Sequence, residues 1–174
     1  MNIQKYNRIA VLDTETTDRY WNTCAPVQIA AVICDNKGNI IDSFNERIKT
    51  THTISPDASA VHGIYAKDLE NCRGEIAVLT DFCVWMKQQE VDCVLTYNGE
   101  AFDRRMLNAR CEKLGIHYEE VLKLYLTDLN GKLDILKPFY DKLSLFDGLI
   151  TSKGLAYKHL EWKITHVSIY AQTR

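Results

Sequence analysis

RIAVLD, at residues 8–13, is a short apolar run that ends in an acid, and a continuous apolar segment, VQIAAVIC, follows at residues 27–34. The turn-forming residues NKGN at 36–39 come next, before an alternating segment, IIDSFNERI, at 40–48. Apolar runs bounded by turn residues predict strands, and two long strands joined by a short glycine-containing turn predict an antiparallel hairpin. The beginning of the chain therefore predicts three neighbouring strands.

Beyond these strands, helical and strand-like segments alternate. The expected elements are a helix starting at Ser55-Pro56, a helix over Glu75–Gln89, a strand over Val91–Tyr97, a helix over Glu100–Leu114, a strand over Val121–Leu126 and helical structure from Leu133 onward. Proline suits the first helical position. In the second expected segment, apolar residues at Ile76, Leu79, Cys83 and Met86 form a stripe with helical spacing.

This order of elements predicts an α/β fold. We expect a mixed central sheet, antiparallel in its first three strands and parallel thereafter, flanked by helices on its faces. With 174 residues, the chain has the length of one domain, which we expect to cover residues 1–174. In such sheets the functional crevice lies at the strand ends, near a switch in connectivity.

Composition and charge exclude several classes of protein. Lys plus Arg number 21 and Asp plus Glu 23, for a net charge of −2, so a broad basic surface that grips nucleic acid is not expected. No stretch approaches the roughly 20 apolar residues of a membrane span, and the N-terminus lacks the apolar segment of a signal peptide. The six cysteines form no C-x-x-C pair, so we expect them to be reduced and buried. We therefore expect a cytoplasmic protein that does not contact membranes.

Acidic residues mark the end of the first strand. Asp13 and Glu15 are two positions apart, so in an extended segment they point to the same face. Neighbouring carboxylates repel each other unless a cation lies between them, which indicates a metal site; a solvated strand end is the alternative. Asp103 lies early in a predicted helix, where the helix dipole alone favours an acid. Spacing alone therefore leaves both interpretations open.

Three blocks of sequence, taken together, carry a family resemblance. VLDTETT at 11–17, ISPDASAVHGI at 54–64 and YNGEAFDRRML at 97–107 resemble the successive motifs of the DnaQ-like (DEDDh) 3′→5′ exonuclease superfamily. The wording is closest to exonuclease X and to polymerase III epsilon-type proofreading exonucleases. The resemblance runs from about Arg8 to the C-terminus. It implies a ribonuclease H-like fold and the release of nucleoside 5′-monophosphates from a 3′ end, with two Mg²⁺ ions, or Mn²⁺, as cofactor.

The resemblance assigns roles to individual residues. Asp13, Glu15 and Asp103 are implied to be catalytic metal ligands. Residues implied to contact or position the terminal nucleotide are Thr14, Thr16, His62, Asn98 and Phe102. On chemical grounds, core packing is the main role expected of Phe102. Without the motif, His62 would be interpreted as a histidine at a helix end whose ring nitrogens are hydrogen-bonded within the protein.

The last motif of the family departs from its pattern here. Relatives carry a histidine and, five positions later, an aspartate, both on a C-terminal helix. His166 fits the histidine, which acts as the general base, but Ala171 stands at the aspartate position. The chain stops at Arg174, so this helix is expected to be truncated. Alanine offers no carboxylate, so one ion should bind weakly and turnover should fall, whereas aspartate at 171 should restore digestion. An engineered substitution, a degenerate member or one residue lost from Tyr-Asp-Ala-Gln each explain this alanine. Tyr157 with Glu161 resembles the version of this motif that has tyrosine in place of histidine, but it carries Glu instead of Asp and is the weaker match.

The expected substrate is the 3′ end of a nucleic acid, with single-stranded DNA preferred. Two alternatives remain: a catalytically inactive module that binds nucleic acid or a partner protein, and a 3′→5′ exoribonuclease of the same superfamily. A polymerase or another protein is a further candidate partner. The sequence makes no prediction of oligomeric state.

Overall fold

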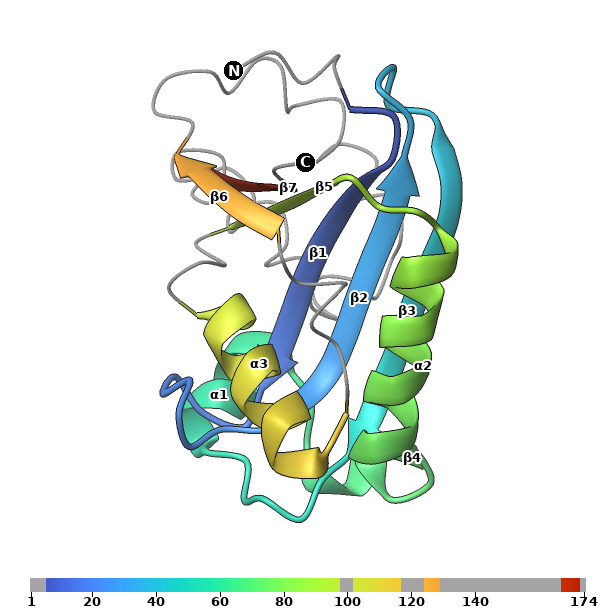
Figure 1. Ribbon diagram of the computed structural model, residues 1–174. Coiled ribbons are helices and arrows are strands. Elements are labelled where there is room, and N and C mark those ends of the chain that lie inside the picture. The colour runs from blue at the N-terminus through green and yellow to red at the C-terminus, as the bar shows by residue number, and fades with distance from the viewer. Residues whose placement is uncertain (1–5, 98–101, 117–123, 129–166, 173–174) are drawn as a thin grey trace.

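The chain forms an α/β structure in which helices pack on a mixed sheet (Figure 1). The computed structural model describes residues 6–97, 102–116, 124–128 and 167–172. The elements in these ranges are β1 (Ile9–Thr16), β2 (Pro26–Cys34), β3 (Ile40–Lys49), α1 (Pro56–His62), the 3-10 helix η2 (Ala66–Leu69), β4 (Arg73–Gly74), α2 (Glu75–Gln88), β5 (Cys93–Tyr97), α3 (Asp103–Leu114), β6 (Leu124–Asp128) and β7 (Val167–Gln172). No helix in these ranges is long and apolar enough to cross a membrane.

The sheet has the strand order β4-β3-β2-β1-β5-β7-β6. β2 pairs antiparallel with both β1 and β3, and β5 is parallel to β1. β7 is antiparallel to β5 on one side and to β6 on the other. The predicted mixed α/β sheet is confirmed, with β7 as an additional antiparallel strand between β5 and β6.

The hairpin between β2 and β3 forms as its turn residues predict. Oδ1 of Asp35 accepts hydrogen bonds from the backbone N–H groups of Lys37 (2.9 Å) and Asn39 (2.8 Å). Gly38 adopts a φ of 81°, a left-handed conformation that glycine takes without steric cost. Hydrogen bonds from Asn39 lower the pKa of the Asp35 carboxyl. This turn fixes the register that buries all nine residues of β2.

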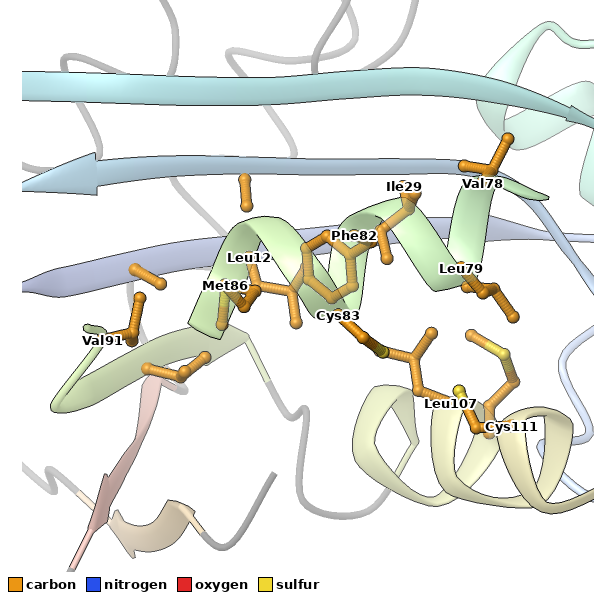
Figure 2. Packing of buried hydrophobic residues seen from close by; sticks show 14 of the residues in the cluster. Leu12, Ile29, Val78, Leu79, Phe82, Cys83, Met86, Val91, Leu107 and Cys111 are labelled. Carbon is orange, nitrogen blue, oxygen red and sulfur yellow. The ribbon is translucent and has the colours of Figure 1, made fainter. Parts of the chain in front are cut away.

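α2 and α3 cover one face of the central strands, and the core lies between them and the sheet (Figure 2). The buried residues of α2 are Val78, Leu79, Phe82, Cys83 and Met86. Ile76, which the predicted stripe includes, is instead 57% exposed. At about 100° per residue, Ile76 lies roughly 90° round the helix from the middle of this buried face, whereas Glu75 lies close to its middle.

Several boundaries differ from the sequence prediction. α3 begins at Asp103, with Phe102 as its N-cap, so Phe102 precedes the helix that was expected to start at Glu100. β6 begins and ends later than the expected strand over Val121–Leu126. Most of the helical structure expected from Leu133 onward lies outside the described residues.

The prediction of a C-terminal helix is wrong for Val167–Gln172, which form strand β7. The segment contains Val167, Ile169 and Tyr170, residue types that favour strands. Its backbone pairs on both sides, with β5 and with β6, so its hydrogen-bonding groups are satisfied without a helix.

Candidate active site

The first two acids lie at the C-terminal end of β1. Asp13 pairs in register with Ala30 of β2 and Glu15 with Gln28, and both acids are half-buried. Ala10 and Leu12 belong to the core beneath α2 and α3. Because side chains alternate along a strand, Asp13 and Glu15 share the face opposite to that core, as predicted. β1 is therefore a rigid, buried support for two neighbouring carboxylates.

Asp103 reaches the same end of β1 from the other face. It is the first residue of α3 and only 6% exposed. Its Oδ1 accepts a hydrogen bond from the Thr14 hydroxyl, across 89 positions of sequence. Thr14 stands between Asp13 and Glu15 in the chain. The structure thus brings the third acid to the residue that separates the first two.

The carboxylates suit a hard divalent cation. Carboxylate oxygens are the ligands preferred by Mg²⁺ and Mn²⁺, and Asp103 is the first residue of α3. Within the part of the chain that the structure describes, no group of three or more His, Cys, Asp or Glu side chains is arranged to hold a metal. The three acids are thus of the residue type that binds such an ion, but Asp103 lies against Thr14, whose hydroxyl occupies one of its oxygens.

His62 and Thr16 form a buried connection just beyond the acids. Nε2 of His62 lies 3.1 Å from the carbonyl oxygen of Thr16, and Nδ1 accepts the N–H of Ile64 at 3.0 Å. Because Nδ1 accepts, Nε2 carries the proton and donates to Thr16. Burial lowers the pKa of His62, which favours this neutral ring. Both ring nitrogens are thus engaged within the chain, and they tie the end of α1 to the end of β1.

Of the other residues implied by the resemblance, Thr16 and Phe102 lie in the described part of the chain. The hydroxyl of Thr16 donates to the carbonyl of Asp18 at 2.7 Å. Phe102 is partly buried against the main core, which confirms its expected packing role. Asn98 and His166 lie outside the described residues.

The strand β7 determines where position 171 lies. Ala171 pairs with Cys93, the first residue of β5, whereas Val167 pairs with Tyr97, the last. β5 runs parallel to β1, and Cys93 is level with Ile9, at the start of β1. Ala171 therefore lies at the end of the sheet opposite to the acids, and the start of β7 lies nearer to them.

Sequence reasoning missed a buried ion pair behind the site. Nε and Nη2 of Arg110, on α3, donate to the two carboxylate oxygens of Glu75, on α2, each at 2.5 Å. Their side chains are 9% and 10% exposed, and Nη1 of Arg110 lies 3.3 Å from Nε2 of His52. Helical spacing could have predicted that Arg110 is buried, because it follows Met106 and Leu107 by four and three positions and so lies on the same buried face of α3.

Comparison with known proteins assigns the chain to a family. The family model described as Exonuclease (RNase T) matches residues 10–158. The chain belongs to this exonuclease family, and with it to the DnaQ-like 3′→5′ exonuclease superfamily.

The similar sequences are much longer proteins. The PolC-type DNA polymerase III of Thermotoga maritima is 29% identical over 140 residues, which are 80% of this chain but 9% of that protein. Its Streptococcus pyogenes counterpart is 32% identical over 103 residues, 59% of this chain and 7% of that protein. The chain thus spans less than a tenth of the curated relatives it matches.

Solved structures of exonuclease I share the fold. E. coli exonuclease I in complex with a dT13 oligonucleotide has a TM-score of 0.57 at 21% identity, over 63% of this chain and 24% of that one. Exonuclease I from Methylocaldum szegediense has a TM-score of 0.52 at 22% identity, over 57% of this chain and 22% of that one. At these identities the likeness establishes the ribonuclease H-like fold alone.

Proposed function

We propose that this chain hydrolyses single-stranded nucleic acid from its 3′ end, with DNA as the preferred substrate, and releases nucleoside 5′-monophosphates. The observation that carries the proposal is the hydrogen bond between Thr14 and Asp103, which joins the third acid to the Asp13–Glu15 strand end in a chain of the exonuclease family. The names of PolC-type polymerases and the dT13 oligonucleotide bound to exonuclease I support the choice of DNA.

Asp13, Glu15 and Asp103 would hold two divalent cations, Mg²⁺ or Mn²⁺. When bound, such ions polarise the phosphodiester and stabilise the leaving 3′ oxygen. Thr14 positions the Asp103 carboxylate through its hydroxyl. His166 accepts the proton of the attacking water, since imidazole titrates near neutral pH.

Thr16 and His62 complete the proposed site. The Thr16 carbonyl is fixed by His62, and its hydroxyl by Asp18, so the backbone after Glu15 has one defined path. The terminal nucleotide would lie against this backbone, and Asn98 and Phe102 would flank it. His62 acts here as a positioning residue, because its ring nitrogens are occupied by Thr16 and Ile64.

Asp103→Asn tests the proposal sharply, because the amide oxygen can still accept from Thr14 while the negative charge is lost. We expect the wild type to release mononucleotides from a 5′-labelled single strand with Mg²⁺ or Mn²⁺ but not with EDTA. We expect Asp103→Asn to lower this rate by about 100-fold or more, comparable to the loss of one group that stabilises charge in a transition state. Circular dichroism checks that the variant keeps its fold.

The same assay separates the alternatives. DNA and RNA strands of equal sequence, assayed side by side, distinguish a deoxyribonuclease from an exoribonuclease. Binding of a strand without any metal-dependent release would instead identify an inactive binding module and contradict the proposal. Release that is unchanged in Asp103→Asn would contradict the assigned site.

A further inference from the structure

The loop between β1 and β2, which follows the strand that carries Asp13 and Glu15, displays two aromatic rings. It starts directly after Thr16, and its Tyr20 and Trp21 side chains are 52% and 36% exposed. The guanidinium carbon of Arg105, on α3, lies 5.8 Å from the centre of the Trp21 ring. That of Arg19 lies 5.1 Å from the centre of the Tyr20 ring. We call these four residues the aromatic platform.

Hydrogen bonds within the loop hold the platform in place. Thr17 N–H donates to the carbonyl of Ala25 at 2.9 Å, and Ala25 N–H donates back to the Thr17 hydroxyl at 3.0 Å. Cys24 N–H donates to the carbonyl of Tyr20 at 2.9 Å. Cys24 and Ala25 are themselves buried. The rings are therefore held outward by an ordered loop, which reduces the entropy lost when a ligand binds them.

The two segments of chain that form the platform also carry the acids of the candidate site. Arg105 is two residues beyond Asp103 in the first turn of α3, and the loop continues the strand that carries Asp13 and Glu15. Figure 1 shows this loop, in blue after β1, on the side of the molecule occupied by α1 and α3. Ser55 N–H donates to the carbonyl of Thr17 at 2.9 Å, which fixes the loop against the start of α1.

The chemistry of the platform matches an unpaired base and its phosphate. Bases of any sequence stack on aromatic rings, and guanidinium groups bind phosphate oxygens and add cation–π attraction. The net charge of the chain is −2, so positive charge for a polyanion must come from local groups. Arg105 and Arg19 provide such groups here, and the carboxylates of Asp18 and Asp57 act electrostatically on Arg19, so Arg105 is the main candidate for a phosphate contact.

We propose that the aromatic platform binds an unpaired nucleotide of the single strand whose 3′ end enters the active site. This inference rests on the proposed function, since it assumes that the strand end lies at the acids. It adds a binding subsite formed by Trp21 and Arg105, and it gives the loop a role in holding strands longer than the terminal nucleotide.

The test measures binding without cutting. A fluorescein-labelled oligothymidylate of about ten nucleotides, longer than the shortest single-strand sites known, is titrated with protein in EDTA, and fluorescence anisotropy gives the Kd. We expect Trp21→Ala to raise the Kd roughly 5- to 100-fold, the range for losing one base–aromatic stack. Trp21→Phe retains a ring and should stay close to the wild type. Val84→Ala, an exposed apolar position on α2, is the matched control and should change nothing.

Further arms identify the ligand and guard against misfolding. Arg105→Ala removes one of the platform's two guanidinium groups, the one carried by α3, and should also raise the Kd. Oligouridylate should bind through the same residues, whereas blunt duplex DNA, which offers no unpaired base, should bind much more weakly. Circular dichroism confirms that each variant is folded.

Two results would overturn the proposal. One is a Trp21→Ala protein that binds the oligonucleotide as tightly as Val84→Ala does. The other concerns self-association, measured by sedimentation velocity. If the wild type self-associates while Trp21→Ala stays monomeric and keeps its full oligonucleotide affinity, the platform is an interface between copies of the chain. If binding depends on Trp21 but the wild type releases no mononucleotides with Mn²⁺, the platform stands and the proposed exonuclease activity fails.

Discussion

His62 is the residue whose role the structure changes most. Its position in VHGI implied contact with the substrate, yet it is 3% exposed and both ring nitrogens bond within the chain. A neutral imidazole is the only ring form that can donate from Nε2 and accept at Nδ1. The residue therefore connects the acidic end of β1 to α1 without needing to reach the substrate.

This role makes the stability of the protein depend on pH. Burial lowers the pKa of His62 below its ordinary 6.5, so below that value the unfolded chain binds the proton more readily than the folded chain. The stabilisation is therefore complete above 6.5 and is lost as the pH falls through the lower, folded pKa. We expect His62→Gln, which does not titrate, to show a weaker fall in unfolding free energy between about pH 7.5 and pH 5.5 in urea. Equal slopes would contradict the neutral, buried imidazole.

Thr14 gives a second prediction at the same scale. Its hydroxyl donates to Asp103, and hydrogen bonds to charged groups contribute about 1.5–3 kcal/mol. We expect Thr14→Val to lower kcat by roughly 10- to 100-fold, since a barrier change of 1.4 kcal/mol is about tenfold. Thr14→Ser keeps the hydroxyl and should retain most of the rate. Steady-state kinetics on a labelled single strand measure both variants, and a fully active Thr14→Val would show that Asp103 needs no such support.

At the scale of elements, α2 and α3 are joined by one buried ion pair within their shared core. The two bonds between Arg110 and Glu75 are parallel and nearly removed from solvent, and they raise the pKa of Arg110. Arg110 also meets His52, which precedes α1. The pair therefore fixes the helix that begins with Asp103 relative to its neighbours.

Breaking this pair should be costly. We expect Glu75→Gln to lower the unfolding free energy by about 3–5 kcal/mol, because Arg110 then keeps a buried charge without its partner. The matched control is Asp81→Asn, which removes the exposed pair with Arg73, where the side chains are 49% and 52% exposed. Exposed pairs contribute at most about 1 kcal/mol. Urea unfolding compares the two, and equal losses would mean that the buried pair is not structurally important.

At the scale of the whole molecule, the register of β7 separates position 171 from the acids. Ala171 and Val167 pair with opposite ends of β5, four residues apart, or about 13 Å along a strand. An aspartate at 171 would accordingly lie beside Cys93 and Tyr125, not beside Asp13. The expectation that this position provides the fourth ligand came from the family pattern and presumed a helix.

Ala171→Asp tests this placement directly. We expect the substitution to leave Mn²⁺ affinity, measured by isothermal titration calorimetry, and mononucleotide release close to wild-type values. Asp13→Asn, at the acidic end of β1, should instead weaken Mn²⁺ binding under the same conditions. A large gain of affinity and activity in Ala171→Asp would show that the C-terminal segment reaches the acids in the active protein.

The fold was largely predictable because most of its helices and strands are indicated by residues close together in the sequence. Apolar runs, the turn at residues 36–39 and the proline at position 56 each depend on neighbouring residues only, and each prediction is confirmed. Helix α2 was predicted almost to its ends, and Leu79, Cys83 and Met86 of its predicted stripe are buried. The exception is the first turn, where the Ile76 side chain is exposed and the side chain of Glu75 is turned inward. A buried glutamate is explained only by Arg110, 35 positions away.

The candidate site shows the same division. Motif order and strand patterning were enough to predict an α/β exonuclease-family protein with acids at the end of its first strand, because both features can be recognised in the amino-acid sequence. Three further features became known only from the contacts in the folded chain: Asp103 bonds to Thr14, His62 points inward to Thr16, and Val167–Gln172 pair as a strand. These outcomes depend on which distant partners satisfy each buried polar group and strand edge, and no local pattern records that competition.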